Sequence, residues 1–332
     1  MKIMRIIVAV VLTAALLYVA RNTSRGRPEF VTHTENGYTF EMMTVPKGLE
    51  HGMETIRLKI TGEMEPGLKP MFRQSKFGQD ETTALYKYGG VPLLVEDSAT
   101  GEYYTEFSTL ARGDRFYYYF EIRDATGGLR ASFTSDDRDP FVFKFIGEVP
   151  LYIIGPHIFF MFATAFCVVM AFLHSFKLLS GDTDVHPLAF YIFLSVVATF
   201  LGSYPWGFGM NYYAFGTIWE GVPFGTDATD NKTQLLFVYL LFLTLATVGS
   251  LRKGGPGRHL YSPKALGRFG VGAFGLMLVI YLIPHSIQFS AALTKRVCYG
   301  FIGLVALLYL IGLLSRPKSR GKQSRPERRA KT

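Results

Sequence analysis

Cysteine and charged residues are both scarce in this chain of 332 residues. The two cysteines, Cys167 and Cys298, lie inside long apolar stretches, where thiols usually behave as small hydrophobic groups. No cysteine occurs in residues 21–150, which excludes a disulfide framework and a cysteine-based zinc site there. Charged residues make up 18% of the chain, below the quarter or so typical of soluble domains. This composition favours a partly membrane-embedded protein.

Common sequence motifs of enzymes and transporters are also missing. The chain contains no P-loop, no G-x-S-x-G, no H-E-x-x-H and no paired internal repeat. No charged residue stands in the middle of an apolar segment, where it would mark an ion path. A nucleic-acid partner is not expected, because the sequence has neither a recognition motif nor a basic folded domain. These absences argue against hydrolysis, transport and nucleic-acid binding.

Long apolar segments are, by contrast, well represented. A membrane-spanning helix needs about 20 mostly apolar residues. The candidate spans are residues 6–20, 151–172, 188–203, 235–251, 269–289 and 297–314. The first follows the charged start "MKIMR" and has the anatomy of a signal sequence. Because Tyr18 occupies a position where cleavage needs a small residue, residues 1–22 are expected to remain as a signal anchor; a cleaved signal peptide is the alternative.

Basic residues predict the orientation of these spans, because cytoplasmic loops carry an excess of lysine and arginine. The tail 316–332 is strongly basic and is expected to touch anionic membrane lipids. The loop after the fourth span carries five more basic residues: Arg252, Lys253, Arg258, Lys264 and Arg268. Both chain ends are therefore predicted inside, with residues 21–150 extracytoplasmic. The signal-anchor form and the short loops favour a prokaryotic inner membrane.

Residues 29–148 show the alternation of β-strands. In "TIRLKITG", Ile56, Leu58 and Ile60 alternate with polar residues, and "RFYYYFEIRD" has an apolar or aromatic residue at every second position. Alternation of this kind indicates strands with one buried face. About seven to nine short strands in a region of this length predict an antiparallel β-sandwich.

The run "TLARGDRFYYYFEIRDATGG" resembles the turn and strand pair of fibronectin type III and related immunoglobulin-like domains. In those domains a leucine and a glycine, here Leu110 and Gly113, precede an aromatic strand, here with Phe116 and Tyr118. A hairpin that contains glycine follows. The resemblance implies a fold, and a fold does not name an activity. Such domains most often bind partners or act as spacers.

Two histidines lie at similar depth in two different spans. His157 follows Pro156 near the outer end of the second span, and His285 follows Pro284 near the outer end of the fifth. At 1.5 Å per residue, both lie roughly 5–12 Å below the outer surface. Two imidazoles at matched depth can ligate a b-type haem. Alternatively, each histidine donates a hydrogen bond to a carbonyl freed by its neighbouring proline, or serves a proton relay or a quinone site.

The connector 204–234, between the third and fourth spans, is long and aromatic. It contains both tryptophans of the chain, Trp206 and Trp219, and aromatic residues at this density are typical of the lipid headgroup level. Its glycines and prolines predict an irregular chain. Long ordered loops tend to be functional. We therefore expect the connector to dock beneath the sandwich and to form one composite surface with it.

Polar residues close the connector just before the fourth span. Asp230 or Asn231 is predicted to cap that helix, because its first N–H groups have no partner in lipid. A cap does not explain Glu220 or the tryptophans. A cation site built from Glu220, Asp227 and Asp230 is an open alternative, and the sequence does not identify a metal. The candidate partner or ligand site consists of Trp206, Trp219, Glu220, Asp227, Asp230 and Asn231.

The sequence thus predicts an α+β membrane protein. Its parts are the signal anchor, the β-sandwich 29–148, a five-helix transmembrane bundle over 149–315 and a basic cytoplasmic tail. We expect a non-enzymatic accessory or binding subunit whose sandwich and connector 204–234 engage a protein partner or a ligand on the outer side. The alternative is a membrane electron-transfer subunit with a b-type haem or a quinone site at His157 and His285.

Overall fold

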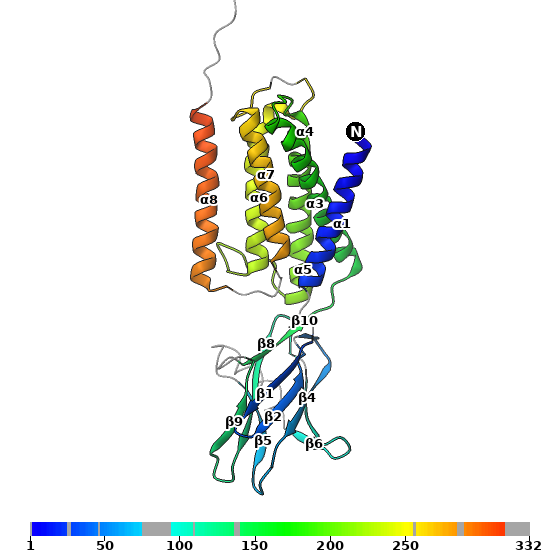
Figure 1. Cartoon of the computed structure of the whole chain (residues 1–332), viewed down its shortest axis with the longest axis vertical. Helices are drawn as coiled ribbons and strands as arrows, with labels where there is room; N and C mark the ends of the chain where they lie inside the picture. The colour runs from blue at the N-terminus through cyan, green and yellow to red at the C-terminus, as the bar shows by residue number, and fades with distance from the viewer. Residues whose placement is uncertain are drawn as a thin grey trace, which may run out of the picture.

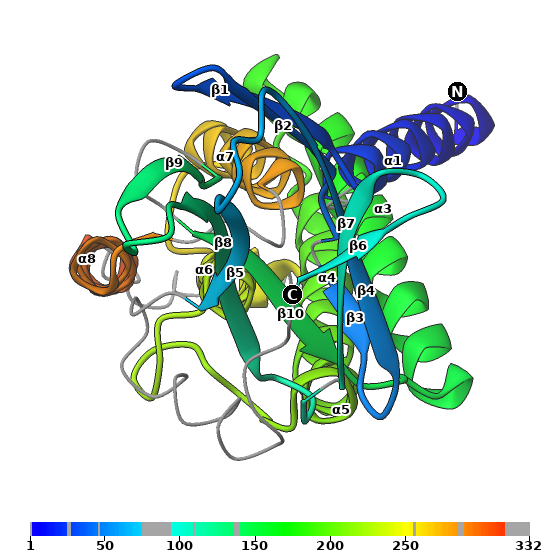
Figure 2. The ribbon, with the colours of Figure 1, turned by 90° about the horizontal axis from the view of Figure 1, so that it is seen from below.

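A computed structural model of the chain shows a bundle of long helices with a β-sandwich against one end (Figure 1). The end of the bundle away from the sandwich holds the start of helix α1 (Lys2–Ser24) and the last residues of helix α8 (Ala291–Leu314). Seen from below, the sandwich lies across the ends of the central helices, with α1 and α8 at the periphery (Figure 2). The structure describes residues 2–24, 28–45, 47–74, 94–108, 110–135, 140–254, 257–283 and 289–315.

The strands form two sheets, in the orders β1-β2-β4-β7-β6 and β3-β10-β8-β5, with β9 paired to β8. The strands are β1 Phe30–Glu35, β2 Tyr38–Met43, β3 Lys47–Leu49, β4 Met53–Thr61, β5 Lys69–Gln74, β6 Val95–Asp97, β7 Glu102–Ser108, β8 Arg115–Arg123, β9 Leu129–Phe133 and β10 Phe141–Ile146. The two sheets are compatible with the predicted sandwich. The pairing is antiparallel except between β3 and β10, which run parallel.

The core of the sandwich is aromatic. Alternation along β8 buries Phe116, Tyr118, Phe120 and Ile122, each 2% exposed or less. The rings of Tyr118 and Phe141 stack with their centroids 5.4 Å apart. Burial of one such side chain contributes about 1.5–3 kcal/mol, so a core of this kind holds the sandwich together without disulfides.

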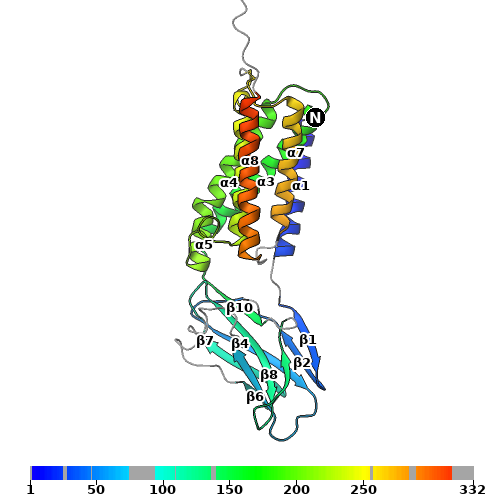
Figure 3. The same ribbon diagram turned by 90° about the vertical axis from the view of Figure 1, so that its left-hand side faces the viewer.

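Six helical segments among the described residues are long and apolar enough to cross a membrane. They are α1, α3 Leu151–Leu179, α4 His186–Ser203 continued by α5 Pro205–Phe215, α6 Ala228–Thr247, α7 Pro263–Leu282 and α8. Their presence beside the β-rich unit is consistent with the expected α+β membrane protein. The basic loop between α6 and α7 lies at the end of the bundle away from the sandwich (Figures 1 and 3).

Helix α1 is packed as a member of the bundle. One of its faces buries Ala9, Leu16 and Ala20 in the bundle core. Helix α1 contacts α3 and α7, so the described part of the bundle contains one more helix than the five predicted for it. The spacing of seven and four residues keeps all three side chains on one face of a helix.

The connector 204–234 is more helical than the sequence predicts, and this prediction was wrong. It contains α5, and it also contains the first turns of α6, which was expected to start near residue 235. The glycines do not break α5, because they serve close packing. A Cβ at Gly209 would lie 3.1 Å from the Ile153 side chain of α3, and a Cβ at Gly207 would lie 3.2 Å from the carbonyl oxygen of Gly202 in α4. Small residues allow helices in a membrane to approach closely.

Candidate functional site

The sandwich joins the bundle through the carboxyl end of α5. The amide of Gly147, just after β10, donates to the carbonyl oxygen of Ala214 at 2.9 Å. The Arg112 Nη1 atom donates to the carbonyl oxygen of Tyr213 at 3.3 Å. The last four carbonyls of a helix have no partner within it. The sandwich therefore caps α5, and a cation at this end also interacts favourably with the helix dipole.

Two contacts between cations and rings reinforce this junction. The Arg112 guanidinium carbon lies 4.9 Å from the centre of the Tyr212 ring. The Lys144 Nζ atom lies 3.9 Å from the centre of the Phe215 ring. Such contacts contribute about 0.5–2 kcal/mol, more when they are shielded from water. The sandwich and the connector are therefore in direct contact through these side chains, as the predicted composite surface requires.

The cap of α6 differs from the predicted one. It is Asp227, whose Oδ1 accepts from the amides of Thr229 at 2.8 Å and Asp230 at 3.1 Å. Asp230 and Asn231 lie inside the first turn of the helix and are buried. The prediction that one of them is the cap was wrong, because α6 begins earlier than its apolar stretch does.

Asp230 and Asn231 instead hold the connector against the bundle. The Asp230 carboxylate accepts from Asn211 Nδ2 of α5 at 2.9 and 3.1 Å, and from the amide of Glu220 at 2.7 Å. The Asn231 side chain accepts from the amide of Val222 at 2.9 Å. Two buried side chains therefore determine the path of residues 216–227 between α5 and α6.

The two predicted tryptophans take different places. Trp219 stacks on Tyr204 with ring centroids 5.7 Å apart, and Phe208 meets it edge-on at 5.8 Å. These aromatic contacts support one wall of a cavity. Trp206 is half-buried on α5 and is not among the described residues that line a cavity here.

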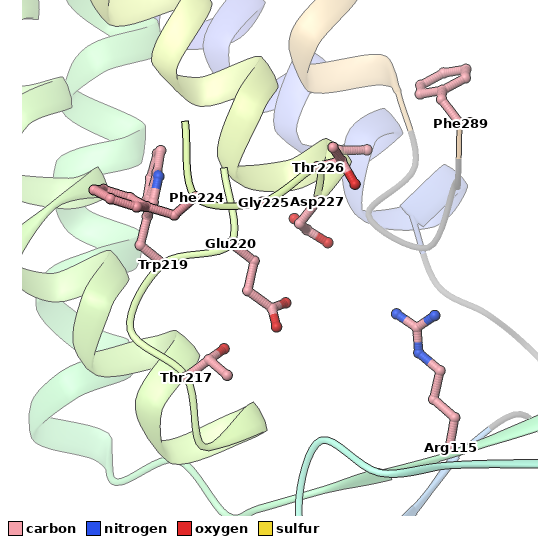
Figure 4. A pocket seen from close by; sticks show the side chains of 10 residues that line it. Arg115, Thr217, Trp219, Glu220, Phe224, Gly225, Thr226, Asp227 and Phe289 are labelled. Carbon is pink, nitrogen blue, oxygen red and sulfur yellow. The ribbon is translucent and has the colours of Figure 1, made fainter. Parts of the chain in front are cut away.

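Two adjacent cavities lie between the sandwich and the bundle, and they share Trp219, Glu220 and Asp227 as a common wall. The larger one has a volume of about 470 Å³ and is drawn in Figure 4. It is lined by Arg115, Thr217, Trp219, Glu220, Phe224, Gly225, Thr226, Asp227, Ala228 and Phe289. The smaller one, of about 260 Å³, reaches from Lys144 on β10 to His157 on α3 and Asp230 on α6.

Charges of opposite sign face each other across the larger cavity. Arg115 extends from the sandwich towards Glu220 and Asp227 on the connector (Figure 4). In the described part of the chain, neither Arg115 nor Lys144 forms an ion pair with these carboxylates. Burial lowers the pKa of the Lys144 amine and Arg115 lowers it further, while Asp227 and Glu220 raise it.

His157 lines the smaller cavity, and its Nδ1 atom lies 2.9 Å from the carbonyl oxygen of Gly202. That carbonyl belongs to the last turn of α4, where helix carbonyls lack partners. The acceptor is thus on a neighbouring helix and not next to Pro156. A donating Nδ1 leaves Nε2 with a free lone pair. His285 lies outside the described residues, so the paired-histidine haem site remains a prediction.

The proposed cation site is not supported. Among the residues that the structure describes, no group of three or more His, Cys, Asp or Glu side chains could hold a metal ion. Both carboxylate oxygens of Asp230 accept hydrogen bonds from Asn211 and the amide of Glu220, and Oδ1 of Asp227 accepts from two backbone amides.

Sequence reasoning missed the residues that the sandwich contributes, above all Arg115 and Lys144. Both occupy outward positions of strands whose alternate residues are aromatic, and Lys144 is the one cation within "FVFKFI". An isolated cation in such a strand is a weak signal, because outward positions are usually polar. Only the docking onto α5 places these two side chains in a cavity.

Comparisons of the chain with protein-family models, with curated proteins and with solved structures gave no match. The assignment of the sandwich fold therefore rests on its sheets and its core, and the assignment of the candidate site rests on its geometry.

Proposed function

We propose that the chain is a non-enzymatic integral membrane binding subunit whose β-sandwich and connector 204–234 engage a ligand or partner on the outer side. The observation that supports this most strongly is the charged cavity whose walls come from both units. Its volume of about 470 Å³ lies within the range of about 300–1,000 Å³ usual for small-ligand sites. Pockets at domain interfaces are frequent binding sites.

The engagement of the wall residues favours binding over catalysis. Asp227 caps α6, while Asp230 and Asn231 hold the connector. Their oxygens already accept hydrogen bonds that the fold needs. The side chains left to meet a ligand are charged and aromatic groups, which suit recognition and orientation.

The proposal includes an orientation, with the sandwich outside and both chain ends inside. Support comes from the basic residues between α6 and α7 and in the first turns of α7, because this end of α7 lies opposite the sandwich. A reporter fused after residue 332 and one inserted near residue 100 should therefore be active on opposite sides of the membrane. Activity of both reporters in one compartment would contradict the proposed orientation.

Native mass spectrometry of the full chain, extracted in a mild detergent, tests whether the cavity binds a ligand. We expect a retained non-covalent adduct that is lost in Thr226→Trp, because the indole fills the cavity. Thr61→Trp, at an exposed position of β4, is the matched control and should keep the adduct. A wild-type chain without any adduct would count against the proposal. A visible spectrum of the same sample tests the haem alternative, since a b-haem band absent in His157→Ala would favour it.

A further inference from the structure

The larger cavity has Arg115 on one wall and the carboxylates of Glu220 and Asp227 on the other, and Lys144 lines the adjacent smaller cavity. Arg115 and Lys144 occupy directly opposite positions on the antiparallel strands β8 and β10, so their side chains lie on one face of the sheet. Like charges in such positions repel each other. Because Lys144 is also half-buried, a nearby anion would stabilise this pair.

The opposite wall of the cavity carries two carboxylates. The amide of Asp227 donates to the carbonyl oxygen of Glu220 at 2.8 Å, which brings the two carboxylates to one segment of the connector. Both line the larger cavity, and Figure 4 shows Arg115 across from them. A cation between these carboxylates would offset their repulsion. Thr217, which also lines the cavity, has a buried hydroxyl without a hydrogen-bond partner among the described residues.

A ligand with separated positive and negative groups fits both walls at once. A simple anion in the larger cavity would satisfy Arg115 but would face the carboxylates, and a simple cation would satisfy the carboxylates but would face Arg115. The planar guanidinium of Arg115 suits phosphate oxygens, which it can bind through two hydrogen bonds. Carboxylates accept hydrogen bonds from the N–H groups of a primary ammonium, which a quaternary ammonium lacks.

The rim of the cavity is apolar and lies beside the spanning helices. Phe224 is 86% exposed, and Phe289, just before α8, is 43% exposed. Both line the cavity although their rings are largely uncovered. Aromatic side chains at the ends of spanning helices are typical of the lipid headgroup level. An acyl chain attached to the bound headgroup would run along this rim.

We propose that the larger cavity binds the headgroup of an aminophospholipid, with the phosphate at Arg115 and the primary ammonium at Glu220 and Asp227. This inference rests on the proposed function, because it names the ligand of the same cavity. The acyl chains then contact Phe224 and Phe289. Phosphatidylethanolamine, an aminophospholipid, carries one positive and one negative group and is neutral overall.

Titration of the delipidated full chain with defined lipids, followed by native mass spectrometry, tests the inference. We expect phosphatidylethanolamine to bind about tenfold or more tightly than phosphatidylcholine or phosphatidylglycerol. Arg115→Gln and Glu220→Gln should each weaken phosphatidylethanolamine binding about tenfold or more. Lys69→Gln and Glu148→Gln, at exposed positions outside the cavity, should change it little. Thermal unfolding of each variant shows that the fold is kept.

Soluble phosphoethanolamine separates the two sources of the same headgroup. It should compete only weakly, because it has no acyl chain for the rim. Competition as strong as that of the lipid would overturn the lipid assignment. If phosphatidylglycerol binds as tightly as phosphatidylethanolamine, and Glu220→Gln leaves binding unchanged, the assignment of a zwitterionic headgroup would be overturned. If the purified chain retains an adduct that Thr226→Trp removes but none of these lipids binds, the inference fails while the proposed function stands.

Discussion

Replacing Gly113 with alanine is expected to loosen the sandwich from the bundle and to lower the free energy of unfolding by about 2–5 kcal/mol. The added Cβ would overlap the carbonyl oxygen of Phe215, and the carbonyl carbon of Phe215 would lie only 3.2 Å away. These are backbone atoms at the end of α5, so they cannot rotate aside as a side chain would. Gly113 also has φ +91, a conformation that L-residues rarely adopt.

Gly37 is the matched control for this substitution. It has φ +86, and no atom lies within 4 Å of the position that a Cβ would take there. Gly37→Ala should therefore lower the free energy of unfolding only by the cost of a positive φ for an L-residue, about 1–2 kcal/mol. Thermal unfolding and hydrogen exchange of residues 205–215, measured on the full chain in detergent, distinguish the two variants. Faster exchange of α5 is expected for Gly113→Ala alone; equal behaviour would mean that the contact with Phe215 has no stabilising role.

Replacing Asp230 with alanine is expected to release the connector and to destabilise the chain by about 2–5 kcal/mol. Asp230 is 7% exposed and accepts from Asn211 Nδ2 and from the amide of Glu220. Its removal leaves the amide of Glu220 without its acceptor and leaves Asn211 Nδ2 with only the carbonyl oxygen of Ile218 at 3.4 Å, and a lost partner of this kind costs about 1–3 kcal/mol for each group. Because Glu220 then loses its anchor, ligand binding in the cavity should be lost as well.

Asp230→Asn and Asp227→Asn provide the comparison. Asparagine at 230 keeps one acceptor oxygen, so it should have a smaller effect than alanine. Asparagine at 227 still caps a helix about as well as aspartate does, and its effect on stability should be small. Thermal unfolding of the three variants gives the order, and hydrogen exchange of residues 216–227 localises the change. An Asp230→Ala variant as stable as the unmodified chain would show that these hydrogen bonds do not hold the connector.

The elements with a strong and regular pattern were predictable. Alternation in β8 placed Phe116 and Tyr118 in the core, as the structure confirms. Apolar runs of about 20 residues predicted the spanning helices, because each must satisfy its own backbone in lipid. The direction of successive spans then placed the connector at the same end as the sandwich. Each of these inferences requires only the local sequence pattern and the environment, lipid or water, in which the segment lies.

The helix boundaries in the connector were not predictable in this way. The start of α6 depends on Asp227 as cap, and the polar residues that follow it are buried by contacts with α5. Helix α5 tolerates its glycines because Gly209 packs against Ile153 of another helix. A glycine inside a helix costs about 1 kcal/mol relative to alanine, so local propensity favours a loop there. The helix forms because tertiary packing contributes more than this cost.

The sequence by itself determined the class of this protein, because hydrophobic runs and strand alternation respond to lipid and water before any long-range contact forms. Only the tertiary structure decided the site. Arg115 and Lys144 come to line two adjacent cavities because β8 and β10 pair and because the sandwich caps the end of α5. Those contacts join residues that are far apart in the chain, and no local pattern encodes them.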